Sequence, residues 1–112
     1  MRILLVEDEP LIALDLESML VRLGHEVVGV ADTEKEAIRL AAVTRPDFAF
    51  VDIKLRDGFT GPRIVARLQA DFGLYCAFVT GNAEQIIETG AVVVQKPFTT
   101  AAIASALPAL SV

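Results

Sequence analysis

The run Phe48-Ala-Phe-Val-Asp52 constrains this chain most, because an uninterrupted apolar stretch leads directly to a carboxylate. Aromatic and β-branched residues in so short a run predict a buried strand. Ligands of an open parallel sheet bind just beyond the carboxyl ends of the strands, so Asp52 would lie where a ligand binds. An acid at a strand end is also typical of a helix cap or a turn. The ends of the other strands must decide between these interpretations.

Further apolar runs of strand length alternate with helical patterns along the chain. Strands are expected at residues 2–6, 26–30, 48–52, 75–79 and 91–95. Pro10 begins a helix, because proline needs no N–H partner in the first turn. Thr33 and Glu36 form a capping box for the next helix, and Thr99 or Thr100 can cap the last one. Five alternating strand and helix units predict an α/β fold with helices on both faces of a parallel sheet.

Length and composition limit the functions that this chain can have. We expect one domain, residues 1–112, since this length supports one core and no second module. A net charge of −5 without any cluster of Lys and Arg argues against nucleic acid or an anionic membrane as the partner. The first apolar stretch, residues 3–6, is too short for a membrane span or a signal peptide. The single cysteine, Cys76, lies in an apolar run and fits a reducing compartment, so a cytoplasmic location is expected.

Polar side chains follow four of the five expected strands. They are Glu7 and Asp8, Asp52, Thr80 and Lys96. The carboxyl ends of parallel strands meet at one edge of the sheet, so these groups should converge. Clustered carboxylates raise one another's pKa, and a divalent cation would relieve that repulsion. An all-oxygen site suits Mg²⁺, with Asp8 and Asp52 as ligands and Glu7 as a direct or water-mediated third.

A strand-end aspartate beside a metal ion can also attack phosphorus. Asp52 would then form an aspartyl-phosphate while the cation takes one phosphoryl oxygen. The Lys96 ammonium suits a second oxygen, and the Thr80 hydroxyl with a nearby backbone N–H suits a third. The simpler alternative is that Lys96 pairs with the acids as a structural ion pair.

The motifs at the strand ends resemble those of the response regulator receiver domain of two-component signalling, in the right order and over essentially the whole chain. They are Glu7-Asp8, Asp52, Thr80 and Lys96-Pro97-Phe98. The resemblance implies a flavodoxin-like, doubly wound fold with a five-stranded parallel sheet in the order 2-1-3-4-5. It also implies that the Lys96-Pro97 bond is cis.

The resemblance implies a function as well. A sensor histidine kinase or phosphotransfer protein would donate a phosphoryl group to Asp52, with Mg²⁺ held by Asp8, Asp52 and the backbone carbonyl of Lys54. The chain would be a stand-alone regulator that signals through a phosphorelay or buffers it. It would catalyse only its own phosphorylation and dephosphorylation, so we do not expect an enzyme in the ordinary sense.

Two features depart from the usual receiver pattern. Val93 stands where receivers usually carry an aromatic switch residue, and the short segment 83–89 leaves room for one or two turns, so the fourth helix should be shortened. The sequence Phe78-Val-Thr-Gly81 instead resembles an atypical subgroup with a Phe-Ala-Thr-Gly signature.

A loop containing Gly58 and Gly61 follows Asp52, and both glycines are expected to adopt a positive φ in a tight turn. Lys54 in this loop and Asn82 each lie two residues beyond a strand-end site residue. They would flank the path by which water reaches a phosphoryl group, so we expect them to set its lifetime.

The expected output face combines the outward side of strand 91–95 and the residues Ile86 and Ile87 with the uncharged residues 99–112. A downstream protein or a second copy of the chain would dock there, with the signal passing through segment 81–90. An apolar helix needs cover on its whole circumference, and one sheet covers only one side. The simpler explanation is that small Ala and Ser residues tolerate water.

Two other classes of protein compete with the receiver. A haloacid-dehalogenase-like phosphatase also uses a strand-end aspartate nucleophile and Mg²⁺, but it needs a second acid where this chain has Lys54. A flavodoxin-like or dinucleotide-binding module would need a glycine-rich turn after strand 2–6. The acids at 7–9 would repel its cofactor phosphate.

Overall fold

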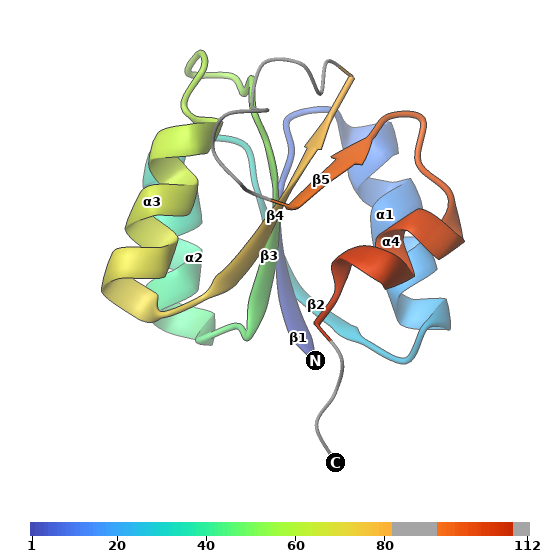
Figure 1. Cartoon of the computed structure of the whole chain (residues 1–112). Helices are drawn as coiled ribbons and strands as arrows, with labels where there is room; N and C mark the ends of the chain where they lie inside the picture. Colours follow the sequence, from blue (N-terminus) through green and yellow to red (C-terminus); the bar gives the residue numbers. More distant parts are fainter. Residues whose placement is uncertain (82–91, 109–112) are drawn as a thin grey trace.

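In the described part of the chain, five parallel strands form one sheet in the order β2-β1-β3-β4-β5, with α1 and α4 on one face and α2 and α3 on the other (Figure 1). The computed structural model describes residues 1–81 and 92–108. The strands are β1 Arg2–Val6, β2 Glu26–Ala31, β3 Phe48–Asp52, β4 Tyr75–Thr80 and β5 Val92–Gln95. The helices are α1 Pro10–Arg22, α2 Glu34–Thr44, α3 Gly61–Phe72 and α4 Thr100–Ala106. The expected doubly wound α/β fold and strand order are confirmed.

The sheet separates two hydrophobic cores because successive strand residues point to opposite faces. Leu4 and Val51 belong to the core beneath α2 and α3, whereas Leu5 and Phe50 belong to the core beneath α1 and α4. Every residue of β3 is buried, as expected for a central parallel strand covered on both sides. Packing on both faces holds β3 in place and thereby fixes the position of Asp52 at its end.

The helix starts largely follow the sequence signals. The Thr33 hydroxyl accepts a hydrogen bond from the Glu36 N–H at 3.3 Å, and the Thr99 hydroxyl accepts one from the Ala102 N–H at 3.1 Å. Thr99 is therefore the cap of α4. The capping box of α2 is only half formed, since the Glu36 carboxylate pairs with Arg39 instead of turning back to Thr33.

Gly58 and Gly61 serve different purposes in the β3–α3 loop (residues 53–60) and the start of α3. Gly58 has a φ of 106°, as expected for a tight turn. The expectation of a positive φ at Gly61 is wrong. A Cβ there would lie 2.1 Å from the backbone oxygen of Asp52 and 2.6 Å from the Cα of Ile53. Glycine is needed at position 61 because the start of α3 packs directly on the end of β3.

The C-terminal part of the chain forms a shorter helix than its composition suggests. Helix α4 ends at Ala106, and Pro108 follows. Its Ile103 is fully buried while Ala104 and Ser105 are exposed, so small residues occupy the solvent side. The Lys96-Pro97 bond is cis, as the resemblance implied. The expected short helix at 83–89, Asn82 and most of segment 81–90 lie outside the described residues.

None of the described helices has the length and apolar character needed to cross a membrane.

Candidate functional site

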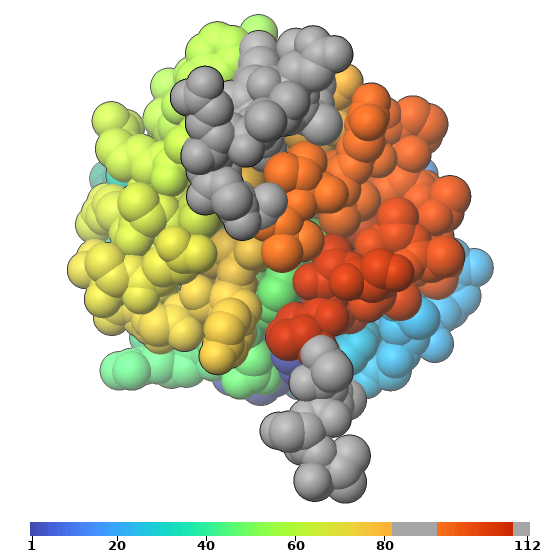
Figure 2. All heavy atoms as spheres, viewed as in Figure 1, coloured from blue at the N-terminus to red at the C-terminus, as the bar shows by residue number. Residues whose placement is uncertain are grey.

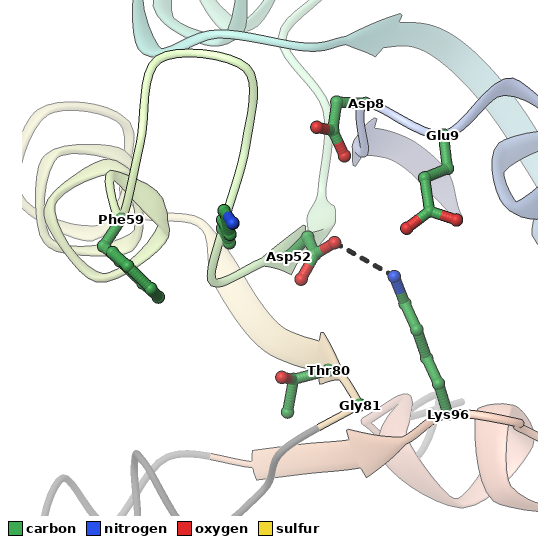
Figure 3. A pocket seen from close by; sticks show the side chains of 8 residues that line it. Asp8, Glu9, Asp52, Phe59, Thr80, Gly81 and Lys96 are labelled. Carbon is green, nitrogen blue, oxygen red and sulfur yellow. Dashed lines mark hydrogen bonds and ion pairs between the residues drawn. The ribbon is translucent and has the colours of Figure 1, made fainter.

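A hollow of about 500 Å³ lies at the carboxyl edge of the sheet (Figure 3). Its lining comes from the ends of four strands and from the β3–α3 loop: Asp8, Glu9, Asp52, Lys54, Phe59, Thr80, Gly81 and Lys96. The structure therefore brings together the site residues predicted at the strand ends. Glu9, Phe59 and Gly81 also line the hollow, although they were not predicted as site residues. The position of Glu9 beside Asp8 was the one signal available for it.

Strand register places these groups at one level. Asp52 pairs with Val79, and Thr80 pairs with Gln95, so Lys96 follows directly at the edge. The Lys96 N–H also donates to the Thr80 backbone oxygen at 2.8 Å, which extends the ladder by one bond. The main chain thus fixes where the Lys96 side chain starts, and the stem reaches across toward Asp52 (Figure 3).

The Lys96 ammonium binds two carboxylates at once. Its Nζ lies 2.6 Å from Glu7 Oε1 and 3.0 Å from Asp52 Oδ2. Both acids are nearly enclosed, with 5% of Glu7 and 8% of Asp52 exposed. Burial by itself lowers the pKa of Lys96, but the hydrogen bonds to the two carboxylates outweigh it, and the net pKa lies above the ordinary value. The ion pair considered above as the simpler alternative is present.

Glu7 differs from an ordinary surface acid. Burial, together with the neighbouring Asp52 carboxylate, raises the pKa of Glu7 to about 7, against the opposing effect of Lys96. The Asp8 N–H donates to Glu7 Oε2 at 3.1 Å, so this carboxyl group is held by main chain as well as by the ammonium. A group of this kind can keep or release a proton near neutral pH.

Glu7, Asp8 and Asp52 each offer a carboxylate oxygen, and these oxygens all lie within 4.8 Å of one another. Hard cations such as Mg²⁺ prefer oxygen ligands and keep several waters, so a small set of carboxylates on an open hollow suits them. The donor set therefore fits Mg²⁺. The predicted fourth contributor, Lys54, lines the same hollow from the β3–α3 loop.

Comparison with known proteins decides the family. The sequence profile of the response regulator receiver domain matches residues 3–108. The chain belongs to this family. The phyllosphere-induced regulator PhyR of Methylorubrum extorquens is 40% identical over 111 residues, which cover 94% of this receiver and 41% of that protein. The transcriptional regulatory protein PdtaR of Mycobacterium tuberculosis is 42% identical over 67 residues, which cover 58% of the receiver and 33% of PdtaR.

Solved structures show the same relationship. The response regulator PhyR from Brucella abortus superimposes with a TM-score of 0.85 at 38% identity, over 95% of this receiver and 47% of that chain. SdrG from Sphingomonas melonis Fr1 superimposes with a TM-score of 0.78 at 37% identity, over 94% and 91% of the two chains. The receiver thus spans less than half the length of the PhyR proteins and most of SdrG.

Lys54 and Val93 have positions in this receiver that the strand-end motifs did not predict. The Lys54 ammonium lies over the Phe59 ring, 5.8 Å from its centroid. Val93, at the usual switch position, is half-buried and packs on the core beneath α2 and α3. The expectation that Lys54 sets phosphoryl lifetime stays a prediction.

Proposed function

We propose that residues 1–112 form one receiver domain that accepts a phosphoryl group on Asp52 from a sensor histidine kinase or phosphotransfer protein, in a Mg²⁺-dependent reaction. The observation that carries the proposal is the convergence of nucleophile, carboxylate ligands, ammonium and hydroxyl on one 500 Å³ hollow, in a chain of the receiver family. The protein would pass the signal along a phosphorelay or buffer it.

The transfer follows from the residues that line the hollow. An oxygen of the Asp52 carboxylate attacks phosphorus, the P–O bond forms as the P–N bond of the donor phosphohistidine breaks, and the electron pair stays on the imidazole nitrogen, which takes a proton. Asp8, Asp52 and the Lys54 carbonyl, with Glu7 directly or through water, would hold Mg²⁺, which would neutralise charge at a phosphoryl oxygen.

Lys96 and Thr80 take the remaining phosphoryl oxygens. The Lys96 ammonium already lies 3.0 Å from Asp52 Oδ2, so it needs only a small side-chain shift to bind an oxygen of the transferred group. The buried Thr80 lines the hollow at the end of β4 and would bind another oxygen (Figure 3). No substrate other than the phosphoryl donor is needed, so the protein modifies itself and does not turn over.

The partners follow from the same proposal. The donor would approach the hollow in the cytoplasm, and a downstream protein or a second copy would bind the face made by β5 and α4, which is open to solvent in Figure 2. Val92 on that face is 49% exposed. The acidic net charge of −5 supports a protein partner over nucleic acid or an anionic membrane.

The phosphatase alternative has no support. Lys54 occupies the position at which a haloacid-dehalogenase-like enzyme needs its second acid, and the family match is to receivers.

Acetyl phosphate with Mg²⁺ tests the proposal without any protein donor. Intact-mass analysis should show one added phosphoryl group per chain, and none on Asp52→Ala or in the presence of EDTA. Labelling of Asp52→Ala at the normal rate would overturn the assignment of the nucleophile. Labelling in EDTA would overturn the requirement for Mg²⁺, and sustained release of phosphate over many cycles would indicate a phosphatase.

A further inference from the structure

The β3–α3 loop has a defined structure of its own. Leu55 and Gly58 form an antiparallel bridge, with the Leu55 N–H donating to Gly58 O at 2.8 Å and the Gly58 N–H donating to Leu55 O at 3.0 Å. The Leu55 side chain is buried in the core beneath α2 and α3. This bridge places Arg56 and Asp57 at the tip of the loop.

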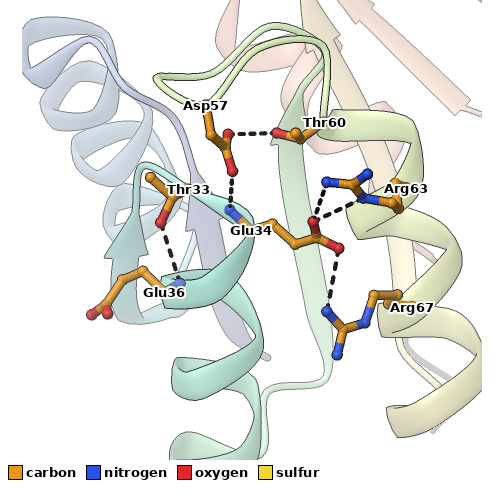
Figure 4. Close-up of polar contacts among 7 residues, drawn as sticks. All are labelled: Thr33, Glu34, Glu36, Asp57, Thr60, Arg63 and Arg67. Atoms are coloured by element: carbon orange, nitrogen blue, oxygen red, sulfur yellow. Dashed lines mark hydrogen bonds and ion pairs between the residues drawn. The ribbon is translucent and has the colours of Figure 1, made fainter.

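Asp57 connects this tip to two other parts of the chain (Figure 4). Its Oδ1 accepts a hydrogen bond from the Thr60 hydroxyl at 2.6 Å, and its Oδ2 accepts one from the Glu34 N–H at 2.9 Å. Glu34 is the first residue of α2, so Asp57 caps a helix to which it does not belong. A carboxylate there is favoured by the unpaired N–H groups and the helix dipole. Burial raises the pKa of Asp57, but these hydrogen bonds, together with one from its own N–H and the charge of Arg63, bring the pKa below its ordinary value.

Neighbouring contacts tie the same elements together. Arg56 pairs with Asp32 at 3.1 Å, just before α2, and Glu34 pairs with both Arg63 and Arg67 of α3 (Figure 4). These arginines are largely exposed, so each pair alone contributes little. Asp57 is different because it bonds a main-chain group of α2 and thus fixes the loop against a rigid element.

The other end of the loop is fixed to the site. The Gly61 N–H donates to Ile53 O at 3.0 Å, and the absence of a side chain at Gly61 lets α3 begin against the Asp52 carbonyl. Lys54 lies between this anchored base and the buried, bridged Leu55. Its main chain therefore depends on contacts at both ends of the loop.

We propose that Asp57 is a positioning residue for the cation site. By bonding Thr60 and the first N–H of α2, it keeps the backbone at Lys54 in place beside Asp52 for binding Mg²⁺. This inference rests on the proposed function, which assigns the Lys54 carbonyl to the cation. Outer contacts that orient metal ligands commonly cost about tenfold or more in affinity when they are lost.

Binding of MgCl₂ to the metal-free chain, measured by amide NMR titration at constant ionic strength, tests the inference. Asp57→Ala should weaken Mg²⁺ binding about tenfold. Asp57→Asn should stay close to wild type, because Asn Oδ1 can accept from the Glu34 N–H and its amide can donate to Thr60. Asp71→Ala, which removes an equal charge from the exposed end of α3, is the matched control and should bind normally.

Hydrogen exchange gives a second readout that needs no cation. The Leu55 and Gly58 N–H groups should exchange faster in Asp57→Ala, and not in Asp57→Asn or Asp71→Ala. Unchanged Mg²⁺ affinity in Asp57→Ala would overturn the positioning role. Equal weakening in Asp57→Asn or Asp71→Ala would also overturn it, because charge alone would then explain the effect. A wild-type chain that binds no Mg²⁺ would overturn both the metal dependence in the proposed function and the positioning of a cation site by Asp57, and exchange at Leu55 and Gly58 would then show whether Asp57 still holds the loop.

Discussion

The two flanks of the hollow are held in opposite ways. The β3–α3 loop is fixed by bonds that do not involve the side chains of the hollow: Asp57 bonds Thr60 and the Glu34 N–H at its tip, and the Gly61 N–H bonds Ile53 O at its end. Lys96, on the other flank, has its ammonium bound to Glu7 and Asp52, which are groups of the hollow itself. Among the described residues, its main chain is tied to Thr80.

The β3–α3 loop is therefore interpreted as a scaffold, and Lys96 as the group that responds to a change at Asp52. Under the proposed function, a phosphoryl group on Asp52 would modify one partner of the Lys96 ammonium and none of the side-chain partners of the loop. We therefore expect a change in the charge of Asp52 to act first on Lys96. We expect the loop to keep its geometry.

We expect the largest effect from Lys96→Met, which keeps most of the aliphatic side chain and removes the charge. Labelling of Asp52 by acetyl phosphate should slow by about 10- to 100-fold, since a charge-assisted hydrogen bond contributes about 1.5–3 kcal/mol. Lys35→Met, on the exposed side of α2, is the control and should label normally. A wild-type labelling rate in Lys96→Met would leave Lys96 with a structural role only.

Gly61→Ala tests the flank of the hollow that the β3–α3 loop forms. The new Cβ would lie 2.1 Å from Asp52 O, and backbone on the β3 side cannot move aside easily. We expect a loss of about 2 kcal/mol in the free energy of unfolding, measured by urea denaturation. Gly73→Ala meets no atom within 4 Å but has a φ of 65°, so it should cost about 1 kcal/mol. Equal urea midpoints for Gly61→Ala and wild type would contradict the close contact.

Glu7, which binds the Lys96 ammonium, should make the free energy of unfolding depend on pH. Its folded pKa of about 7 exceeds the ordinary 4.5, so the folded chain binds the proton more tightly than the unfolded chain. The stability from this group is complete below about pH 4.5 and is lost as pH rises through 7. Without metal, wild type should lose roughly 3 kcal/mol over this window relative to Glu7→Gln, as measured by urea unfolding.

Glu26→Gln, at an exposed end of β2, is the control for that experiment and should follow wild type. A constant difference in unfolding free energy between Glu7→Gln and wild type across the window would show that Glu7 titrates as an ordinary acid.

Local patterns were sufficient for much of the site. Apolar runs of strand length ended on Glu7, Asp52, Thr80 and Lys96, and parallel strands must bring their carboxyl ends to one edge. The convergence of these side chains could thus be predicted before any contact was known. Helix starts at Pro10 and at the caps were predictable for the same reason, because the signal lies within one turn of chain.

The sequence by itself therefore determined which residues lie at the strand ends. Its resemblance to a known family predicted the strand order. Only the tertiary structure decided that Gly61 is needed for close packing on Asp52, and that Asp57 caps α2 across a separation of 23 residues. It also decided that Glu36 turns to Arg39 and that Phe59 lies under Lys54. The physical reason is that side-chain partners depend on how the helices and the β3–α3 loop pack against the sheet, whereas strand and helix signals depend on neighbours in the chain.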